Sequence, residues 1–594
     1  MAFSGGDTTI AVDLGTSNTY LAYQHTAGNV LEEPKEISTI HQGWNEFTLM
    51  NCYCTQNDRH DACDANRQDL YLRTDDKKKL DDVCLPAQLC EFIPTKIKRN
   101  EDNTIQGYKF PIPSIINNLR VNGVRDLNYT NRLPLVHSSI PFAYYSIGKR
   151  PDTEANSYDA MSNGEFKWFY VKDQNGNFNF DNVKKSDFES FVNELLFITR
   201  SHMLCCGYEL ENCSLIWTYP LSFQQQLLSF YKQTWDLTYC KYFNRMLLNA
   251  NGQIINQRDI DNLVKYTNES RSPIYECMTN PGAANLLTVL MDIGGGSTDV
   301  IGYFQNEPQF VTSFGFAGNA LYLGGSMNHK DFANTNNYMR RYVQRNCQTV
   351  FNVAAQIDGV KRIDANAPIN TLMNYGFSEE PVMFNALFNN ASVQFMLQFH
   401  NAAIYYHTAQ LCKISKSDEV PDEIYLTGNG SNLLRCCQDP SLPKRIFSKV
   451  YGQACDRIKI TFVQRPKAAT TLGALKGNRS NLQFNENSAS KQVKMLGDEN
   501  SIYSVNPLQP QINIEDAKEK MNAVRNNVLN FIDVFYDSYQ GTPNFDKNEV
   551  LDCMRYVDGD QMLSFDPYLA NSMFFQYISL LMEQLSIKIC QRPM

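Results

Sequence analysis

The sequence predicts an α/β protein built from two similar lobes and followed by a helical C-terminal extension. Residues 9–23 and 288–303 share one pattern, in which an apolar run, Asp-x-Gly with small polar residues and a second apolar run follow each other. Each segment therefore predicts a strand, a tight turn and a strand. The 594 residues are too many for a single core. Near the C-terminus, apolar residues recur at helical spacing.

Composition excludes several classes of protein. With 43% hydrophobic and 20% charged residues, the chain is neither disordered, collagen-like nor a coiled coil. A net charge of −9 without a long Lys/Arg run gives no reason to expect nucleic-acid binding. No apolar stretch is long enough to predict a membrane span, and the N-terminus lacks the pattern of a signal peptide. Seventeen scattered cysteines indicate reduced thiols and a cytoplasmic protein.

The two turns have the composition of phosphate-binding loops. Glycine lets backbone N–H groups point at an anion without a Cβ in the way, and Ser and Thr add hydroxyl donors. The predicted phosphate-binding residues are Gly15, Thr16, Ser17 and Asn18 in the first turn and Gly294, Gly295, Gly296, Ser297 and Thr298 in the second.

An aspartate ends the first strand of each pair. Asp13 and Asp292 would repel a phosphate, but a carboxylate suits a magnesium ion that keeps its waters and bridges to phosphate. Two such loops would clamp one nucleotide from both sides, with Mg²⁺ held through water. The alternative is that both segments are ordinary hairpins with polar turns.

Seven motifs resemble, in order, those of the actin, seventy-kilodalton heat-shock chaperone and sugar-kinase ATPase superfamily. They are Asp13–Thr19 as the first phosphate loop, Leu215–Pro220 as the first connecting strand, Val264–Glu269 as a strand ending in Asn-Glu, Asp292–Asp299 as the second phosphate loop, Leu323–Ser326 as a Leu-Gly-Gly segment, Glu423–Ser431 as the adenosine motif and Ala468–Ala474 as the second connecting helix. The resemblance covers roughly residues 8–477. The intact string Asp292–Asp299 favours the bacterial-actin and chaperone branches over sugar kinases.

The resemblance implies a two-lobed actin-like ATPase fold, with duplicated ribonuclease-H-like domains around a nucleotide cleft. The implied domains are a first lobe at 1–285, a second lobe at 286–455 with an outer subdomain at about 326–415, a return to the first lobe at 456–477, and an extension at 478–594. It also implies ATP and Mg²⁺ as ligands. The implied catalytic residues are Asp13, Glu269 and Asp292, with Lys167 as a weaker candidate, and Gly324, Gly325, Gly428, Asn429 and Gly430 join the nucleotide-binding residues.

Residues 40–150 depart from this pattern as a long, irregular insertion. They contain Cys52, Cys54, Cys63, Cys84 and Cys90, with His60 among them. No two of these cysteines form the CxxC pair of a structural zinc site, so we expect ordinary thiols, with a zinc site as the alternative. Lys167 lies near the expected position of a catalytic lysine, and its alternative is a surface lysine that buries only its stem.

The tail reads as a polar linker at 478–511 followed by two helices. One apolar face comprises Ala517, Met521, Val524, Val528, Phe531 and Phe535. A second helix is predicted from Asp566 and Pro567, an N-cap and N1 pair, toward Cys590. The stripes are predicted to pack on each other or on the ATPase core, with partner docking as the alternative. No run of short alternating strands predicts a chaperone's peptide-binding β-sandwich.

Together these features predict an ATPase whose nucleotide state opens and closes a two-lobed cleft and drives a partner-binding or assembly switch. A protein partner or self-association is expected. The alternatives are a filament-forming bacterial actin homologue, a small-molecule kinase of the same superfamily, and a scaffold that binds nucleotide without hydrolysing it. Asp13, Glu269 and Asp292 are all present, which disfavours the scaffold.

Overall fold

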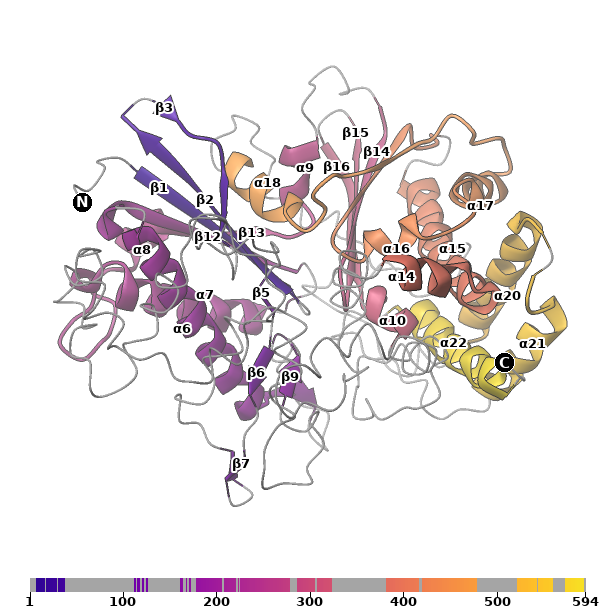
Figure 1. Ribbon diagram of the computed structural model, residues 1–594, viewed down its shortest axis with the longest axis horizontal. Helices are drawn as coiled ribbons and strands as arrows, with labels where there is room; N and C mark the ends of the chain where they lie inside the picture. Colours follow the sequence, from indigo (N-terminus) through magenta and orange to yellow (C-terminus); the bar gives the residue numbers. More distant parts are fainter. Residues whose placement is uncertain are drawn as a thin grey trace. The chain divides into compact units, whose positions relative to one another are not determined.

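A computed structural model of the chain describes residues 7–15, 18–28, 30–37, 112–113, 115–117, 120–121, 124–125, 161–163, 167, 170–172, 178–205, 208–220, 223, 225–277, 286–304, 307–322, 381–415, 419–477, 521–541, 543–558 and 572–591 (Figure 1). These residues form two compact units. Unit 1 contains the described residues up to Thr218 and residues 228–267, and unit 2 contains 219–227 and the described residues from Asn268 onward.

The sheet of unit 1 is built around the first predicted hairpin. Strand β1 (Asp7–Leu14) pairs antiparallel with β2 (Asn18–Ala27) and parallel with β12 (Cys213–Tyr219). Beyond them lie β13 (Val264–Asn268), next to β12, and β3 (Val30–Leu31), β4 (Lys35–Ile37) and β5 (Ile112–Pro113), which pair with β2. The middle of β1 is fully buried and apolar, as expected for a central strand covered on both faces.

The sheet of unit 2 repeats this order around the second predicted hairpin. Its strands, from edge to edge, are β16 (Glu307–Phe314), β15 (Thr298–Phe304), β14 (Thr288–Ile293), β17 (Glu423–Thr427) and β18 (Lys459–Phe462). Strand β14 is antiparallel to β15 and parallel to β17, as β1 is to β2 and β12. The described sheets thus agree with the predicted α/β class and with a duplicated architecture.

Aromatic side chains join the helices of unit 1 to its sheet. Trp217 of β12 stacks on Trp235 of α7 (Gln225–Tyr242), with ring centroids 6.0 Å apart. Phe188 of α6 (Asn182–Cys205) stacks on Tyr231 of α7 at 3.9 Å.

The remaining described elements of unit 1 are η7 (Leu210–Asn212), η8 (Arg245–Leu247), α8 (Gln257–Leu263) and the strand pairs β6 (Ile115–Asn117) with β9 (Met161–Asn163), β7 (Arg120–Val121) with β8 (Val124–Arg125), and β10 (Tyr170–Lys172) with β11 (Phe178–Phe180).

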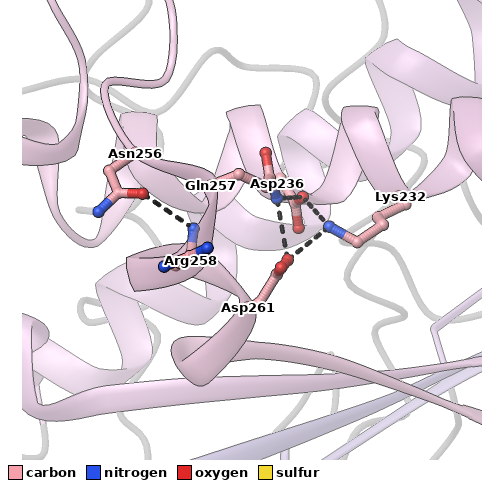
Figure 2. A network of polar contacts seen from close by, with 6 residues as sticks. All are labelled: Lys232, Asp236, Asn256, Gln257, Arg258 and Asp261. Atoms are coloured by element: carbon pink, nitrogen blue, oxygen red, sulfur yellow. Dashed lines mark hydrogen bonds and ion pairs between the residues drawn. The ribbon is translucent and has the colours of Figure 1, made fainter.

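Hydrogen bonds and ion pairs among Lys232, Asp236, Gln257 and Asp261 connect α8 to α7 (Figure 2). Lys232 Nζ donates to Asp236 Oδ2 at 2.9 Å and to Asp261 Oδ1 at 2.7 Å. Gln257 Nε2 donates to the same two oxygens, at 2.7 and 3.0 Å. Asp236 is only 2% exposed, and this burial raises the pKa of its carboxyl, while Lys232 and Gln257 oppose the rise. The network therefore compensates a carboxylate that would otherwise be costly to bury.

We expect Lys232→Met to destabilise the protein, because among the described residues it leaves the buried carboxylate of Asp236 with the neutral amide of Gln257 as its hydrogen-bond donor. Since Lys232 is partly exposed, the loss should be roughly 2 kcal/mol at neutral pH, less than for a fully buried pair. Burial already raises the folded-state pKa of Asp236 above its unfolded value, so its ionised form opposes folding. The loss should therefore shrink as the pH falls toward 4 and Asp236 is protonated. Urea unfolding against pH measures this.

Lys241→Met, in the last turn of the same helix, is the matched control, because Lys241 donates to the neutral amide of Asn193. Its effect should be small and independent of pH over this range. Equal losses in the two variants at neutral pH would show that the network does not compensate a buried charge.

Helix α15 is the central helix of unit 2. It spans Ala391–Ser415, and its residues from Val393 to Cys412 are buried on all sides. The other described helices of unit 2 are α9 (Ser272–Cys277), α10 (Gly318–Tyr322), α14 (Pro381–Asn389), α16 (Ser431–Arg435), α17 (Leu442–Tyr451), α18 (Ala469–Gly477), α20 (Met521–Ser538), α21 (Lys547–Asp558) and α22 (Met573–Gln591).

The described part of the C-terminal extension is helical and packs on unit 2. Helix α20 lies against α15 and α17, and α22 lies against α15, α20 and α21 (Figure 1, yellow). Of the predicted apolar stripe, Val524, Val528, Phe531 and Phe535 are all buried, and the rings of Phe531 and Phe399 of α15 are 5.0 Å apart. This face is therefore core, as the packing interpretation predicted. Ala517 lies outside the described residues.

The helices of the extension differ from the prediction in two respects. Helix α22 begins at Met573, because Ser572 caps it, and Asp566 and Pro567 lie outside the described residues. Helix α21 was not predicted. Within 456–477, β18 pairs with β17 and α18 packs on α9. The predicted domain limits stay predictions. The insertion's cysteines and His60 lie outside the described residues, as do residues 478–511 of the predicted linker.

Within the described ranges, no helix combines the length and apolar character that crossing a membrane requires.

Candidate functional site

The second predicted phosphate loop is the hairpin between β14 and β15. Asp292 pairs with Asp299 across the hairpin, and Ile293 pairs with Thr298. Gly294 N donates to Ser297 O at 2.9 Å, which closes the turn. The three glycines and Ser297 are all described, and Gly295 is buried. A Cβ on Gly294 would lie 3.1 Å from Ser297 O, so glycine lets this turn close tightly.

The predicted adenosine motif lies directly against this hairpin. Because β17 runs parallel to β14, with Thr427 opposite Asp292, the residues after β17 meet the residues after β14. Gly430 N donates to Ile293 O at 2.7 Å. Gly428 has a φ of +76°, and a Cβ there would lie 2.2 Å from Asp292 Oδ1. Glycine is thus required by both the backbone conformation and the approach to Asp292.

Asn429, between these glycines, is buried. Its Oδ1 accepts from Asn432 Nδ2 at 3.1 Å. Its Nδ2 is a buried donor with no hydrogen-bond partner among the described residues. Buried amide donors are normally satisfied, so this Nδ2 can donate to a ligand that approaches the motif.

The second connecting helix brings a hydroxyl to Asp292. Thr470, in the first turn of α18, donates from Oγ1 to Asp292 Oδ2 at 2.9 Å. The same helix packs closely on α9, where a Cβ on Gly473 would lie 1.7 Å from Ser272 O. Thr470 was within a recognised motif but was not predicted as a site residue, because nothing local in the sequence relates it to Asp292.

The turn that carries Glu269 is attached to the same hairpin. Glu269 is 7% exposed, and its N–H donates to Tyr219 O at 2.9 Å. The next residue, Ser270, donates from Oγ to Asp299 Oδ1 at 3.2 Å, and its N–H donates to Asn268 Oδ1 at 2.7 Å. These bonds fix the backbone on both sides of Glu269.

In unit 1, Asp13 occupies the position in β1 that Asp292 occupies in β14. It is 5% exposed, and Thr218 of the parallel strand β12 donates from Oγ1 to Asp13 Oδ1 at 3.4 Å. In both sheets, therefore, an aspartate near the end of one strand lies beside a threonine of the neighbouring parallel strand, Thr218 for Asp13 and Thr427 for Asp292. These threonines were not predicted as site residues. The signal that could have identified them is their position at the end of a motif strand that runs parallel to the strand carrying the aspartate.

Four predicted residues lie outside the described part of the chain: Thr16, Ser17, Gly324 and Gly325. Gly15 is partly buried, and Asn18 begins β2. Lys167 is 2% exposed, so the alternative of a surface lysine is wrong. Its carbonyl oxygen accepts from Tyr231 Oη at 2.8 Å, within unit 1. Its catalytic role stays a prediction.

The oxygen donors beside each aspartate fit a hydrated magnesium ion. Asp13 and Asp292 each provide one carboxylate, with a threonine hydroxyl within 3.4 and 2.9 Å respectively. Mg²⁺ prefers such oxygens and usually keeps several waters. In the described ranges, no cluster of three or more His, Cys, Asp or Glu side chains is placed to hold a metal directly.

Neither family models nor curated proteins give a match to the chain. Among solved structures, MreB5 of Spiroplasma citri bound to ADP is similar over 80% of this chain and 99% of that chain, with 12% identity and a TM-score of 0.32. The same organism's MreB 5 bound to AMPPNP is similar over 79% and 95%, with 11% identity and a TM-score of 0.30. These scores are too low to support inference, so the strand order remains the basis for the fold.

Proposed function

We propose that this chain is an actin-like protein that binds ATP with Mg²⁺, hydrolyses it, and uses the change of nucleotide to switch a protein partner or its own assembly. One observation carries the proposal. The hairpin of Asp292, the Gly428–Gly430 turn, Thr470 and the turn of Glu269 pack on one another in unit 2, although they come from four separate parts of the sequence. Asp13 and Thr218 repeat part of this arrangement in unit 1.

The residues have distinct roles in this proposal. Backbone N–H groups of Gly295 and Gly296 bind phosphate oxygens, while the Gly294 N–H closes the turn on Ser297 O, and the Gly428–Gly430 turn lets the adenosine approach the backbone. Asp292 would hold the waters of Mg²⁺, and Asp13 is the corresponding carboxylate of unit 1. When bound, Mg²⁺ neutralises charge on the phosphate oxygens. Glu269 orients the attacking water, because it follows a strand and is fixed by bonds on both sides.

The switch follows from what hydrolysis removes. Once the γ-phosphate is lost, the second phosphate loop loses a ligand, and the state that ATP favours is no longer stabilised. A partner or a second copy that binds this state more tightly is then released. Fold alone does not identify the protein that recognises this state.

The test is ATP turnover by the purified chain with no acceptor substrate, compared with that of Glu269→Gln. We expect the variant to lose about 100-fold in kcat while its affinity for ATP stays within a few fold, because water orientation acts in the transition state. Turnover without an acceptor supports hydrolysis over transfer to a small molecule. Light scattering with ATP reports assembly.

Glu276→Gln is the matched control. Glu276 lies on α9, close in sequence, and forms an ion pair with Lys476 that contributes little to stability. It should turn over ATP at close to the wild-type rate. If Glu269→Gln loses affinity and turnover equally, Glu269 supports the fold and not the reaction.

A further inference from the structure

The turn of the second predicted phosphate loop is supported from behind by the segment that follows β16. Thr298 Oγ1, at the end of the turn, donates to Phe316 O at 2.6 Å. At the start of the turn, Gly294 O accepts from Gly318 N at 3.2 Å. Both bonds are inside unit 2. The position of Gly294–Ser297 is therefore coupled to the position of Phe316–Gly318.

Two rings in turn hold that segment in place. His400 of α15 is fully buried and stacks on Phe316 at 4.6 Å, and its Nε2 donates to Ala317 O at 2.9 Å. Burial lowers the pKa of His400. Its Nε2 carries a proton, because the carbonyl oxygen that it faces can only accept. The second ring is Phe575, which stacks on Phe314 at 4.2 Å and on Phe316 at 4.8 Å.

Phe575 belongs to the C-terminal extension, and its position there is tightly defined. Ser572 Oγ accepts from Phe575 N at 3.2 Å and caps the first turn of α22. Helix α22 packs on α20, whose Asn527 is fully buried. Asn527 Oδ1 accepts from Tyr406 Oη at 2.7 Å and from Gln410 Nε2 at 2.8 Å, both on α15. Polar bonds of this kind fix one register of the extension on α15.

We propose that Phe575 is a positioning residue for the second phosphate loop, so that the C-terminal extension sets how tightly the chain binds nucleotide. The inference rests on the proposed function. The path runs from Phe575 through Phe316 to Thr298 and Gly318, which hold the two ends of the turn. Because coupling is reciprocal, bound nucleotide also tightens the packing of α22 on this segment.

The adjacent residue provides a matched pair of variants. Phe574 is as buried as Phe575, but its ring packs on Phe531 at 5.8 Å and Tyr406 at 5.8 Å. It contacts the rings of Phe575 and His407 rather than those of Phe314 and Phe316. Phe574→Leu and Phe575→Leu remove the same atoms from the same helix, and leucine keeps most of the buried volume in each case. Both should lower the midpoint of thermal unfolding by similar amounts.

Two measurements on the full chain test the proposal. The first is the affinity for a fluorescent ADP analogue, which should fall about fivefold or more in Phe575→Leu and less than twofold in Phe574→Leu. The second is hydrogen exchange without nucleotide at the amides of Gly294 and Gly318, which should be faster in Phe575→Leu only. Equal exchange in the two variants overturns the inference.

These readouts separate this inference from the proposed function. If the wild-type chain binds no nucleotide but exchange at Gly294 and Gly318 is faster in Phe575→Leu only, the proposed function fails while the link from Phe575 to the turn stands. If nucleotide binds and both variants weaken it equally, Phe575 contributes only to general stability and the inference fails.

Discussion

Asp292→Asn should slow ATP hydrolysis by about 100-fold or more while unit 2 remains folded. Asparagine keeps an oxygen that can accept from Thr470 Oγ1, so the bond to α18 can be retained. It removes the negative charge that would hold a hydrated Mg²⁺. The loss should be roughly 3 kcal/mol or more of transition-state stabilisation, about 100-fold in rate. Steady-state turnover, with circular dichroism as the check on folding, measures it.

Asp422→Asn controls for the general effect of losing a carboxylate in this sheet. Asp422 lies at the other end of the β14–β17 pair, where its Oδ2 accepts from Leu287 N at 3.2 Å. Its variant should retain wild-type turnover. An Asp292→Asn protein that keeps turnover within threefold of the wild type would refute the magnesium role of Asp292.

Gly473→Ala should be the most destabilising single-methyl change in the second unit. The added Cβ would lie 1.7 Å from Ser272 O and 2.5 Å from Ser272 C, which are backbone atoms that cannot rotate away. Helices α18 and α9 must then separate, at a cost of about 3 kcal/mol. We expect the unfolding midpoint to fall by about 5 to 10 °C. Turnover should also fall, because α9 begins three residues after Glu269.

Gly477→Ala, on the same helix, is the matched comparison. Its Cβ would meet the ring of Tyr275 at 2.7 Å, and a side chain can turn aside where a backbone cannot. The expected loss is a third or less of that for Gly473→Ala. Similar midpoints for the two variants would show that α18 and α9 can move apart at little cost.

Both hairpins could be predicted from the sequence because their signal is local. In each, Asp-x-Gly with small polar residues separates two apolar runs, and both runs form strands. The apolar stripe of α20 was readable for the same reason, since helical spacing repeats within a few turns. Helix α21 carries a similar signal in Val550, Cys553, Met554 and Val557, which was overlooked in a short, mostly polar segment.

Other features depended on pairing between distant segments. The approach of Gly428 to Asp292 requires β14 and β17 to align in parallel, with Thr427 opposite Asp292. The bond from Thr470 requires α18 to pack on α9. Likewise, the place of β18 in the second sheet depends on its pairing with β17. A strand of four residues carries no local pattern that shows which sheet it joins.

By itself, the sequence determined the α/β class, the two Asp-containing hairpins and the helical tail, because each depends on spacing between near neighbours. Tertiary structure alone decided that Lys167 is buried, that Thr470 reaches Asp292 and that Phe575 packs behind the second hairpin. Burial and contact between segments far apart in the chain result from the packing of the whole unit, where each side chain takes the space that its neighbours leave.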